Sequence, residues 1–81
     1  MNTKQKIEDF ITSNFPKARE LKTFDDISLL DEGIIDSVGV LELILFLEQT
    51  FAINVEDDEI IPDNLDSVNK LVIYVRSKLK K

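Results

Sequence analysis

The residue best placed for covalent chemistry is a serine, Ser37, which directly follows Asp36. Ser37 opens a run of strong apolar residues that predicts a helix from Ser37 to about Thr50. Free backbone N–H groups and the positive end of the helix dipole stabilise anions at a helix N-terminus. A phosphate ester on the Ser37 hydroxyl would therefore be favoured. The structural alternative is that Asp36 is the helix cap and Ser37 only the first helical residue.

The same three residue types, Asp-Ser-Val, occur a second time at residues 66–68. The motif alone therefore proves nothing, and its context has to decide. The first copy follows an acidic stretch containing Gly33 and opens an acidic helix, whereas the second copy opens a helix that ends in lysines. We expect Ser37, and not Ser67, to present an exposed hydroxyl beside a docking surface.

At about 100° per residue, the helix predicted from Ser37 has two apolar faces. The core face contains Val40, Leu43, Ile44, Leu47 and Phe51, and the opposite side carries Val38, Leu41 and Leu45 beside Glu42, Glu48 and Gln49. An outward apolar strip bordered by carboxylates is typical of a partner-docking surface. Alternatively, Leu21, Phe24 or Leu29 of the preceding loop covers the strip, and both interpretations remain open. Below, Val38, Leu41 and Leu45 are called the outer strip.

The composition excludes several classes of chemistry. The 81 residues include no Cys and no His, so thiol nucleophiles, disulfides, zinc sites and histidine-based acid–base pairs are absent. A serine near carboxylates but without an evident base is not an activated nucleophile, so we do not expect an enzyme. The acidic residues 56–59 lack the ligand spacing of a calcium-binding EF-hand loop, and we interpret them as a solvated helix start.

The charge is distributed unevenly around the net value of −6. Residues 25–66 carry thirteen acids and no Lys or Arg, whereas residues 67–81 carry five bases and no acid. An acidic centre repels nucleic-acid phosphate and anionic lipid and attracts basic protein surfaces. We expect a partner with a basic docking patch and no binding to nucleic acid. The sequence contains neither a signal peptide nor a membrane span, which predicts a soluble, cytoplasmic protein. We also expect a monomer.

The length predicts one domain, residues 1–81, and the periodicity predicts an all-α fold. The expected elements are a helix at 2–15 with Asn2 and Gln5 at its cap, a helix from 37, a short helix at 56–61 stopped by Pro62, and a last helix capped by Asp66. Residues 16–36 carry many large apolar side chains, which predicts a long ordered loop. The result is a small four-helix bundle with three long helices and one short helix.

The last helix has an inner stripe of Val68, Leu71, Val72, Val75 and Leu79. Residues 71–75 are rich in β-branched types, which would also fit a strand. We reject the strand, because the cap, the spacing and the lysines at the C-terminal end all favour a helix.

The residues from Leu30 to Leu43, with Asp-Ser-Val-Gly at positions 36–39, resemble the acyl carrier protein family. The similarity extends through Phe51 and residues 60–62 to Val68 and Tyr74. In that family the serine of an Asp-Ser-Leu motif carries 4′-phosphopantetheine, so the resemblance assigns this prosthetic group to Ser37. It also places recognition surfaces at Asp36, Val38, Glu42, Leu45 and Glu48, to which the outer strip adds Leu41.

The resemblance implies a carrier rather than a catalyst. A phosphopantetheinyl transferase would load Ser37, and the thiol of the arm would hold acyl or aminoacyl groups as thioesters. The expected partners are an acyl- or aminoacyl-activating ligase and acyltransferase or synthase enzymes with basic docking patches. Gly39 stands where carriers of fatty-acid synthesis commonly have an acid, so the motif is more similar to D-alanyl and other specialised carriers. The competing hypothesis is a non-carrier acidic helical adaptor that binds one basic partner, with Ser37 only a helix-start residue.

Overall fold

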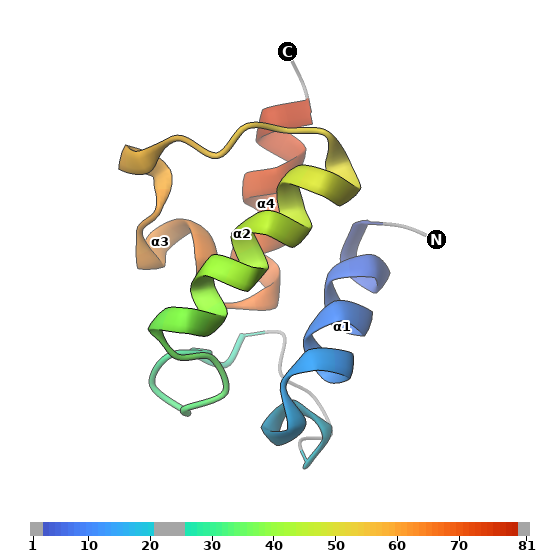
Figure 1. Ribbon diagram of the computed structural model, residues 1–81, viewed down its shortest axis with the longest axis vertical. Coiled ribbons are helices and arrows are strands. Elements are labelled where there is room, and N and C mark those ends of the chain that lie inside the picture. The colour runs from blue at the N-terminus through green and yellow to red at the C-terminus, as the bar shows by residue number, and fades with distance from the viewer. Residues whose placement is uncertain (1–2, 21–25, 80–81) are drawn as a thin grey trace.

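The computed structural model describes residues 3–20 and 26–79. It contains four α-helices: α1 (Thr3–Asn14), α2 (Ser37–Phe51), α3 (Pro62–Leu65) and α4 (Val68–Leu79). Two 3-10 turns, η1 (Pro16–Glu20) and η2 (Asp57–Glu59), lie in the connections (Figure 1). No strand occurs in the described ranges, and residues 71–75 are helical. The predicted all-α bundle of three long helices and one short helix is confirmed.

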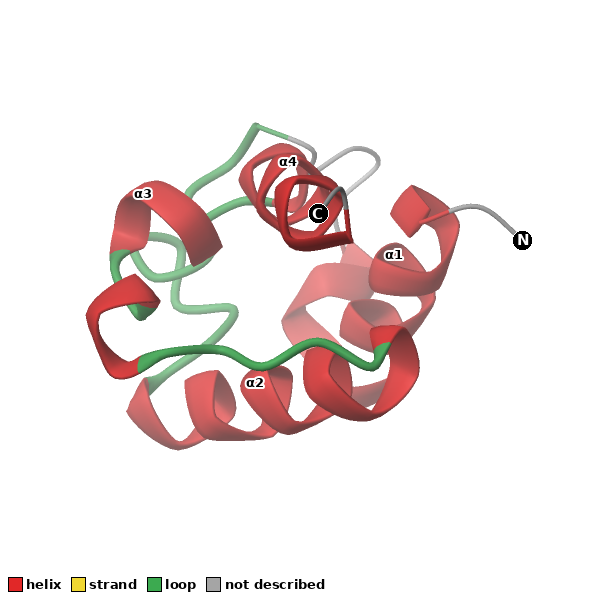
Figure 2. Cartoon of the chain, turned by 90° about the horizontal axis from the view of Figure 1, so that it is seen from above, coloured by secondary structure: helices red, strands yellow, loops and turns green. Residues whose placement is uncertain are grey.

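The helix α4 packs against both α1 and α3. Viewed from above, α2 lies on the opposite side of the molecule from α4 (Figure 2). The fully buried side chains come from α1, the loop before α2, α2 and α4: Ile7, Ile11, Leu29, Leu43, Leu47, Val68, Leu71 and Val75. The predicted inner stripe of α4 is confirmed except at Leu79, the last residue of the helix, which is 52% exposed.

A row of phenylalanines joins α1 to α2. The rings of Phe10 and Phe46 stack with centroids 4.2 Å apart. Phe15 contacts Phe10 edge-on, and Phe51 contacts Phe46 in the same way. Offset and edge-on aromatic pairs of this kind stabilise beyond the area that they bury. The seam between the two helices is thus made largely of aromatic rings.

Asp66 attaches the loop before α2 to the bundle. Its two carboxylate oxygens accept from the Ser28 hydroxyl at 2.5 Å and from the Leu30 N–H at 2.9 Å, and its carbonyl accepts from the Leu29 N–H at 2.8 Å. The prediction that Asp66 caps the last helix is therefore wrong. Ser67 takes that role, because its Oγ accepts from the Lys70 N–H at 3.1 Å. The described part of the long loop is ordered, as predicted.

The predicted bounds of the short helix, residues 56–61, are also wrong. Residues 57–59 form only the turn η2, and the short helix α3 begins at Pro62 instead of ending before it. Proline suits the first position of a helix, since its missing N–H has no intrahelical partner there and its φ is already helical. At the N-terminus, Asn2 lies outside the described residues, and the Gln5 amide donates to Asp9 at 2.9 Å. None of the described helices is long and apolar enough to cross a membrane.

Candidate functional site

Ser37 is the first residue of α2, and its side chain is exposed. Asp36 is the N-cap: its carboxylate accepts from the Gly39 N–H at 2.8 Å, and its carbonyl accepts from the Val40 N–H at 2.9 Å. The predicted cap is confirmed. The Ser37 hydroxyl makes no hydrogen bond to any residue that the structure describes, so it is available for modification.

Ser67, in the second Asp-Ser-Val copy, has the opposite environment. Its side chain is 4% exposed, and its oxygen is occupied by the Lys70 N–H. An enzyme cannot reach this hydroxyl without opening the start of α4. The structure therefore separates the two copies as the sequence context predicted.

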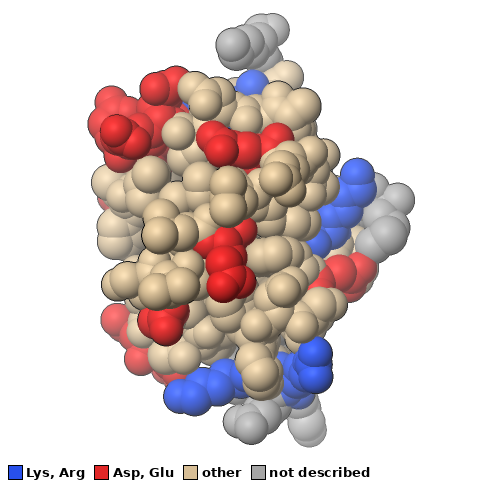
Figure 3. Space-filling view, viewed as in Figure 1, with Lys and Arg blue, Asp and Glu red and all other residues tan. Residues whose placement is uncertain are grey.

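The outer strip lies open on α2. Val38, Leu41 and Leu45 are 65%, 62% and 56% exposed. Figure 3 shows this face of the molecule, where uncharged surface over α2 is interrupted by separate acidic groups. Of the three loop residues that could cover the strip, Leu29 is buried in the core instead, and Leu21 and Phe24 lie outside the described residues. The core face is as predicted, with Leu43, Ile44 and Leu47 buried and with Val40 and Phe51 half-buried.

The predicted docking carboxylates differ in their surroundings. Asp36 and Glu42 are exposed, at the start and in the middle of the strip. Glu48 is only partly exposed, and its carboxylate accepts from the Val55 N–H at 3.0 Å. This contact ties the chain after α2 back to the helix, a structural role that no sequence pattern indicated.

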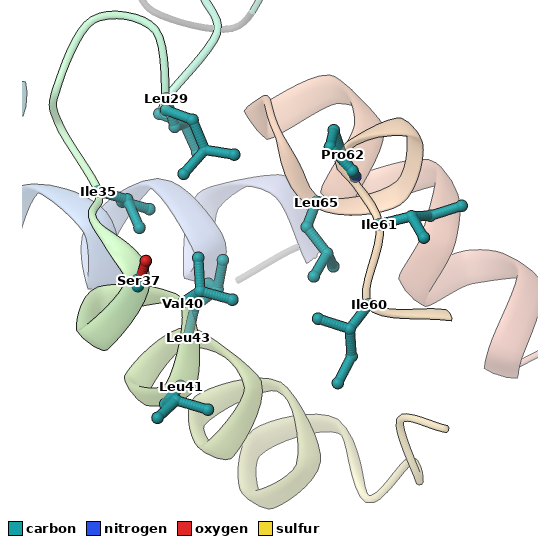
Figure 4. A pocket seen from close by; sticks show the side chains of 11 residues that line it. Leu29, Ile35, Ser37, Val40, Leu41, Leu43, Ile60, Ile61, Pro62 and Leu65 are labelled. Atoms are coloured by element: carbon teal, nitrogen blue, oxygen red, sulfur yellow. The ribbon is translucent and has the colours of Figure 1, made fainter. Parts of the chain in front are cut away.

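An apolar cavity of about 360 Å³ opens beside Ser37, between α2 and α3. The loop before α2, α2 itself, residues 60–62 and α3 supply its walls, with Leu29, Val40, Leu41, Ile60, Ile61 and Leu65 among them (Figure 4). Among the described residues that line the cavity, Ser37 alone has a polar side chain. The volume of the cavity is at the small end of the range for ligand pockets. The cavity was missed in the sequence because its walls come from segments far apart in the chain.

Glu59 links the turn η2 to α4. One carboxylate oxygen, Oε1, accepts from the Tyr74 hydroxyl at 2.9 Å, from Lys78 Nζ at 2.8 Å and from the Glu56 N–H at 3.0 Å. The bond from Lys78, followed by those from Glu56 and Tyr74, lowers the pKa of Glu59 from 4.5 to about 2. Burial and the Glu59 carboxylate raise the pKa of Tyr74. Glu59, Tyr74 and Lys78 are called the Glu59 cluster below.

The lowered pKa of Glu59 predicts an acid-dependent loss of stability. A carboxyl group whose pKa is lower in the folded state stabilises the fold above its unfolded pKa and loses that effect as the pH falls through the folded pKa. We expect wild type to be more stable than Glu59→Gln at pH 7, with the difference shrinking between pH 4.5 and about 2. Urea unfolding at a series of pH values measures this difference. Asp58→Asn is the control for removing one acid from the same turn, and a difference constant down to pH 2 contradicts the prediction.

Gly39 is buried against Phe15, which follows α1, and against Ile35 of the loop before α2. A Cβ at this position would lie 2.8 Å from Phe15 Cε1 and 3.1 Å from Ile35 Cγ2. Gly39 thus has a packing role, since it allows the Phe15 ring to approach α2. The sequence alone does not show this contact of Gly39 with Phe15.

Replacing Gly39 by Ala tests this close approach. In an exposed helix the change would stabilise by about 0.5–1 kcal/mol. Here we expect a net loss of about 1 kcal/mol, because overpacking costs roughly 1–3 kcal/mol and the Phe15 ring is held by Phe10. Urea unfolding checks the sign. In a Phe15→Leu background the same substitution should be neutral or stabilising, and a gain in the wild-type background would contradict the packing role.

Comparison with known proteins places the chain in a family. It is 31% identical to the acyl carrier protein of Buchnera aphidicola subsp. Schizaphis graminum (strain Sg) over 80 residues, covering 99% of this chain and 98% of that protein. It is 35% identical over 76 residues to the D-alanyl carrier protein of Streptococcus uberis, covering 94% of each. The D-alanyl carrier protein of Abiotrophia defectiva is 30% identical over 54 residues, which cover 67% of this chain and 68% of that protein.

In this small helical bundle, the exposed Ser37 begins a helix that also carries the exposed outer strip. This is the arrangement that the resemblance to carrier proteins predicts. The chain belongs to the acyl carrier protein and D-alanyl carrier protein family. It is thus a carrier of phosphopantetheine-linked acyl or aminoacyl groups and not an enzyme. No protein-family model matches the chain, and neither does any solved structure.

Proposed function

We propose that Ser37 carries the 4′-phosphopantetheine arm, transferred to its hydroxyl from coenzyme A by a phosphopantetheinyl transferase. The observation that carries the proposal is the free, exposed hydroxyl of Ser37 on a capped helix start, in contrast to the buried Ser67. Asp36 accepts hydrogen bonds from the N–H groups of Gly39 and Val40. The N–H groups of the residues before them, at the very start of α2, are left to bind a phosphate. The attached arm supplies the thiol that this Cys-free chain lacks.

We further propose that the outer strip, with Asp36, Glu42 and Glu48, is the docking surface. Its exposed apolar centre and acidic border fit enzymes with basic patches: the transferase, a ligase that activates an acyl or aminoacyl group, and acyltransferases or synthases. The family membership removes the support for a non-carrier adaptor. Residues 1–81 then act as one carrier domain, and the family also supports a cytoplasmic location.

Between the two kinds of cargo that the relatives' names mention, the cavity favours an acyl group with an aliphatic chain. Its walls are apolar and it opens beside Ser37, so a hydrocarbon chain gains free energy by leaving water. A D-alanyl group carries an ammonium ion, and burying that charge among apolar side chains is costly. We therefore propose an aliphatic acyl cargo.

The attachment is tested by incubating the chain with coenzyme A, magnesium and a broad-specificity transferase. Intact-protein mass spectrometry should find one added phosphopantetheinyl unit, and peptide mapping should locate it on the segment that contains Ser37. No addition with several transferases would overturn the proposed attachment.

A further inference from the structure

We propose that Glu59 is a positioning residue that sets how tightly the carrier holds an aliphatic cargo, because it links the outer wall of the cavity to α4. The inference rests on the proposed function, in which Ser37 bears the arm and the cavity receives the cargo chain. Glu59 itself does not line the cavity. It acts through the residues that follow it in the chain.

The outer wall is the short segment of Ile60, Ile61 and Pro62. In Figure 4, the Ile60 side chain points into the space between α2 and α3, where Leu41 and Leu65 approach from the other sides. The wall is not part of the core, since Ile60 is half-buried and Ile61 is 43% exposed. Apolar burial alone therefore holds this segment less firmly than it holds α2.

Glu59 accepts hydrogen bonds from residues on both sides of the wall. The Glu59 carboxylate accepts from Tyr74 and Lys78 of α4, and its backbone carbonyl accepts from the Ile61 N–H and the Asn64 side chain, both at 2.9 Å. The turn η2 buries none of its own side chains. The Glu59 side chain therefore ties the start of the wall to α4, whereas the buried Leu65 of α3 holds the other end.

The strength of this link suits a wall that has to admit and release a chain. The side chains of Lys78 and Glu59 are 21% and 29% exposed, so water and salt screen their attraction. Tyr74, in contrast, is buried and gives the cluster a fixed point on α4. We call the wall closed when Ile60 and Ile61 lie as in this structure, and open when they have moved away from the cavity. A cargo that fits the closed wall shifts the population toward the closed state, and loss of the Glu59 cluster shifts it toward the open state.

The test compares two cargoes on the modified protein. The transferase loads wild type and variants from octanoyl- or acetyl-coenzyme A, and hydroxylamine cleavage of each thioester is timed. Each rate is divided by that of the same acyl group on free pantetheine. If the octanoyl chain spends nine-tenths of its time in the cavity, wild type protects it about tenfold relative to acetyl. In Glu59→Ala we expect this ratio to fall to about twofold or less, with the acetyl rate unchanged.

Matched variants separate positioning from general damage. Asp58→Ala removes an exposed acid from the same turn and should keep the wild-type ratio. Tyr74→Phe and Lys78→Met each remove one donor and should lose part of the protection. Glu59→Gln keeps an oxygen for the Tyr74 hydroxyl and should restore part of it. If Glu59→Ala does not fold, the two single-donor variants carry the test.

A second measurement uses the unloaded protein. Amide hydrogen exchange at Ile60 and Ile61 should accelerate at least tenfold in Glu59→Ala relative to Leu47, a buried residue of α2. An unchanged octanoyl ratio together with unchanged exchange overturns the inference. Wild type without chain-length-dependent protection overturns it together with the aliphatic cargo. A failure of the attachment at Ser37 is visible separately, since mass spectrometry reports it before any rate is measured.

Discussion

The Ser37→Ala substitution abolishes addition of the phosphopantetheine arm, whereas Ser67→Ala leaves the addition intact. This expected result follows from access: the Ser37 hydroxyl is exposed and unbonded within the described chain, and Ser67 is 4% exposed with its oxygen occupied by Lys70. Intact-protein mass spectrometry after treatment with coenzyme A and a transferase measures both variants. An arm that persists in Ser37→Ala, or disappears in Ser67→Ala, would place the attachment elsewhere.

The two serine variants should also differ in stability: Ser67→Ala, which keeps the addition of the arm, should be the less stable of the two. Asp36 caps α2, and the exposed Ser37 hydroxyl makes no hydrogen bond within the described chain. We therefore expect Ser37→Ala to change the free energy of unfolding by no more than about 0.5 kcal/mol. Ser67→Ala removes the side-chain cap of α4 and should cost about 1 kcal/mol. Loss of loading in a fully folded Ser37→Ala variant then reports chemistry and not unfolding.

The second large effect is expected at the outer strip. Replacing Leu41 by Asp should lower kcat/KM of the transferase by about 10- to 100-fold, because a leucine side chain buried against a partner contributes roughly 1.5–3 kcal/mol. Leu41 also lines the cavity, so the assay uses coenzyme A without an acyl group, which isolates docking from cargo binding. Steady-state kinetics of arm transfer measure the effect.

The chain offers a matched control for this substitution. Ile73 belongs to α4, which lies on the opposite side of the molecule from α2 (Figure 2), and it is 67% exposed, against 62% for Leu41. Ile73→Asp makes a similar chemical change at a similar exposure, and we expect kcat/KM to stay near wild type. Equal losses in the two variants would show a general effect of added negative charge and would contradict docking through the outer strip.

The long helices could be predicted because their apolar residues repeat over three or more turns, as in α2. The short helix could not, since Pro62 is compatible with both a helix stop and a helix start, and a four-residue helix has no period to decide between them. The choice between Asp66 and Ser67 as cap depends on Ser28 and Leu30, which are more than thirty residues away in the chain.

The same division applies to the site. Ser37, Asp36 and the outer strip lie on one helix, so local spacing was enough to place them together. The cavity and the Glu59 cluster need α2, α4 and the connection between them to be positioned in space. Gly39 belongs to both groups, because its position in the motif is visible in the sequence, whereas its contact with Phe15 is a tertiary one.

The bond between Tyr74 and Glu59 has an optical consequence. The chain contains one tyrosine and no tryptophan, so its tyrosine emission comes from a single ring whose hydroxyl donates to a carboxylate. A carboxylate in hydrogen-bond contact quenches tyrosine fluorescence, and separation of the pair restores it. The protein therefore contains an intrinsic, label-free reporter on α4, whose brightness follows the distance between this helix and the turn before Ile60.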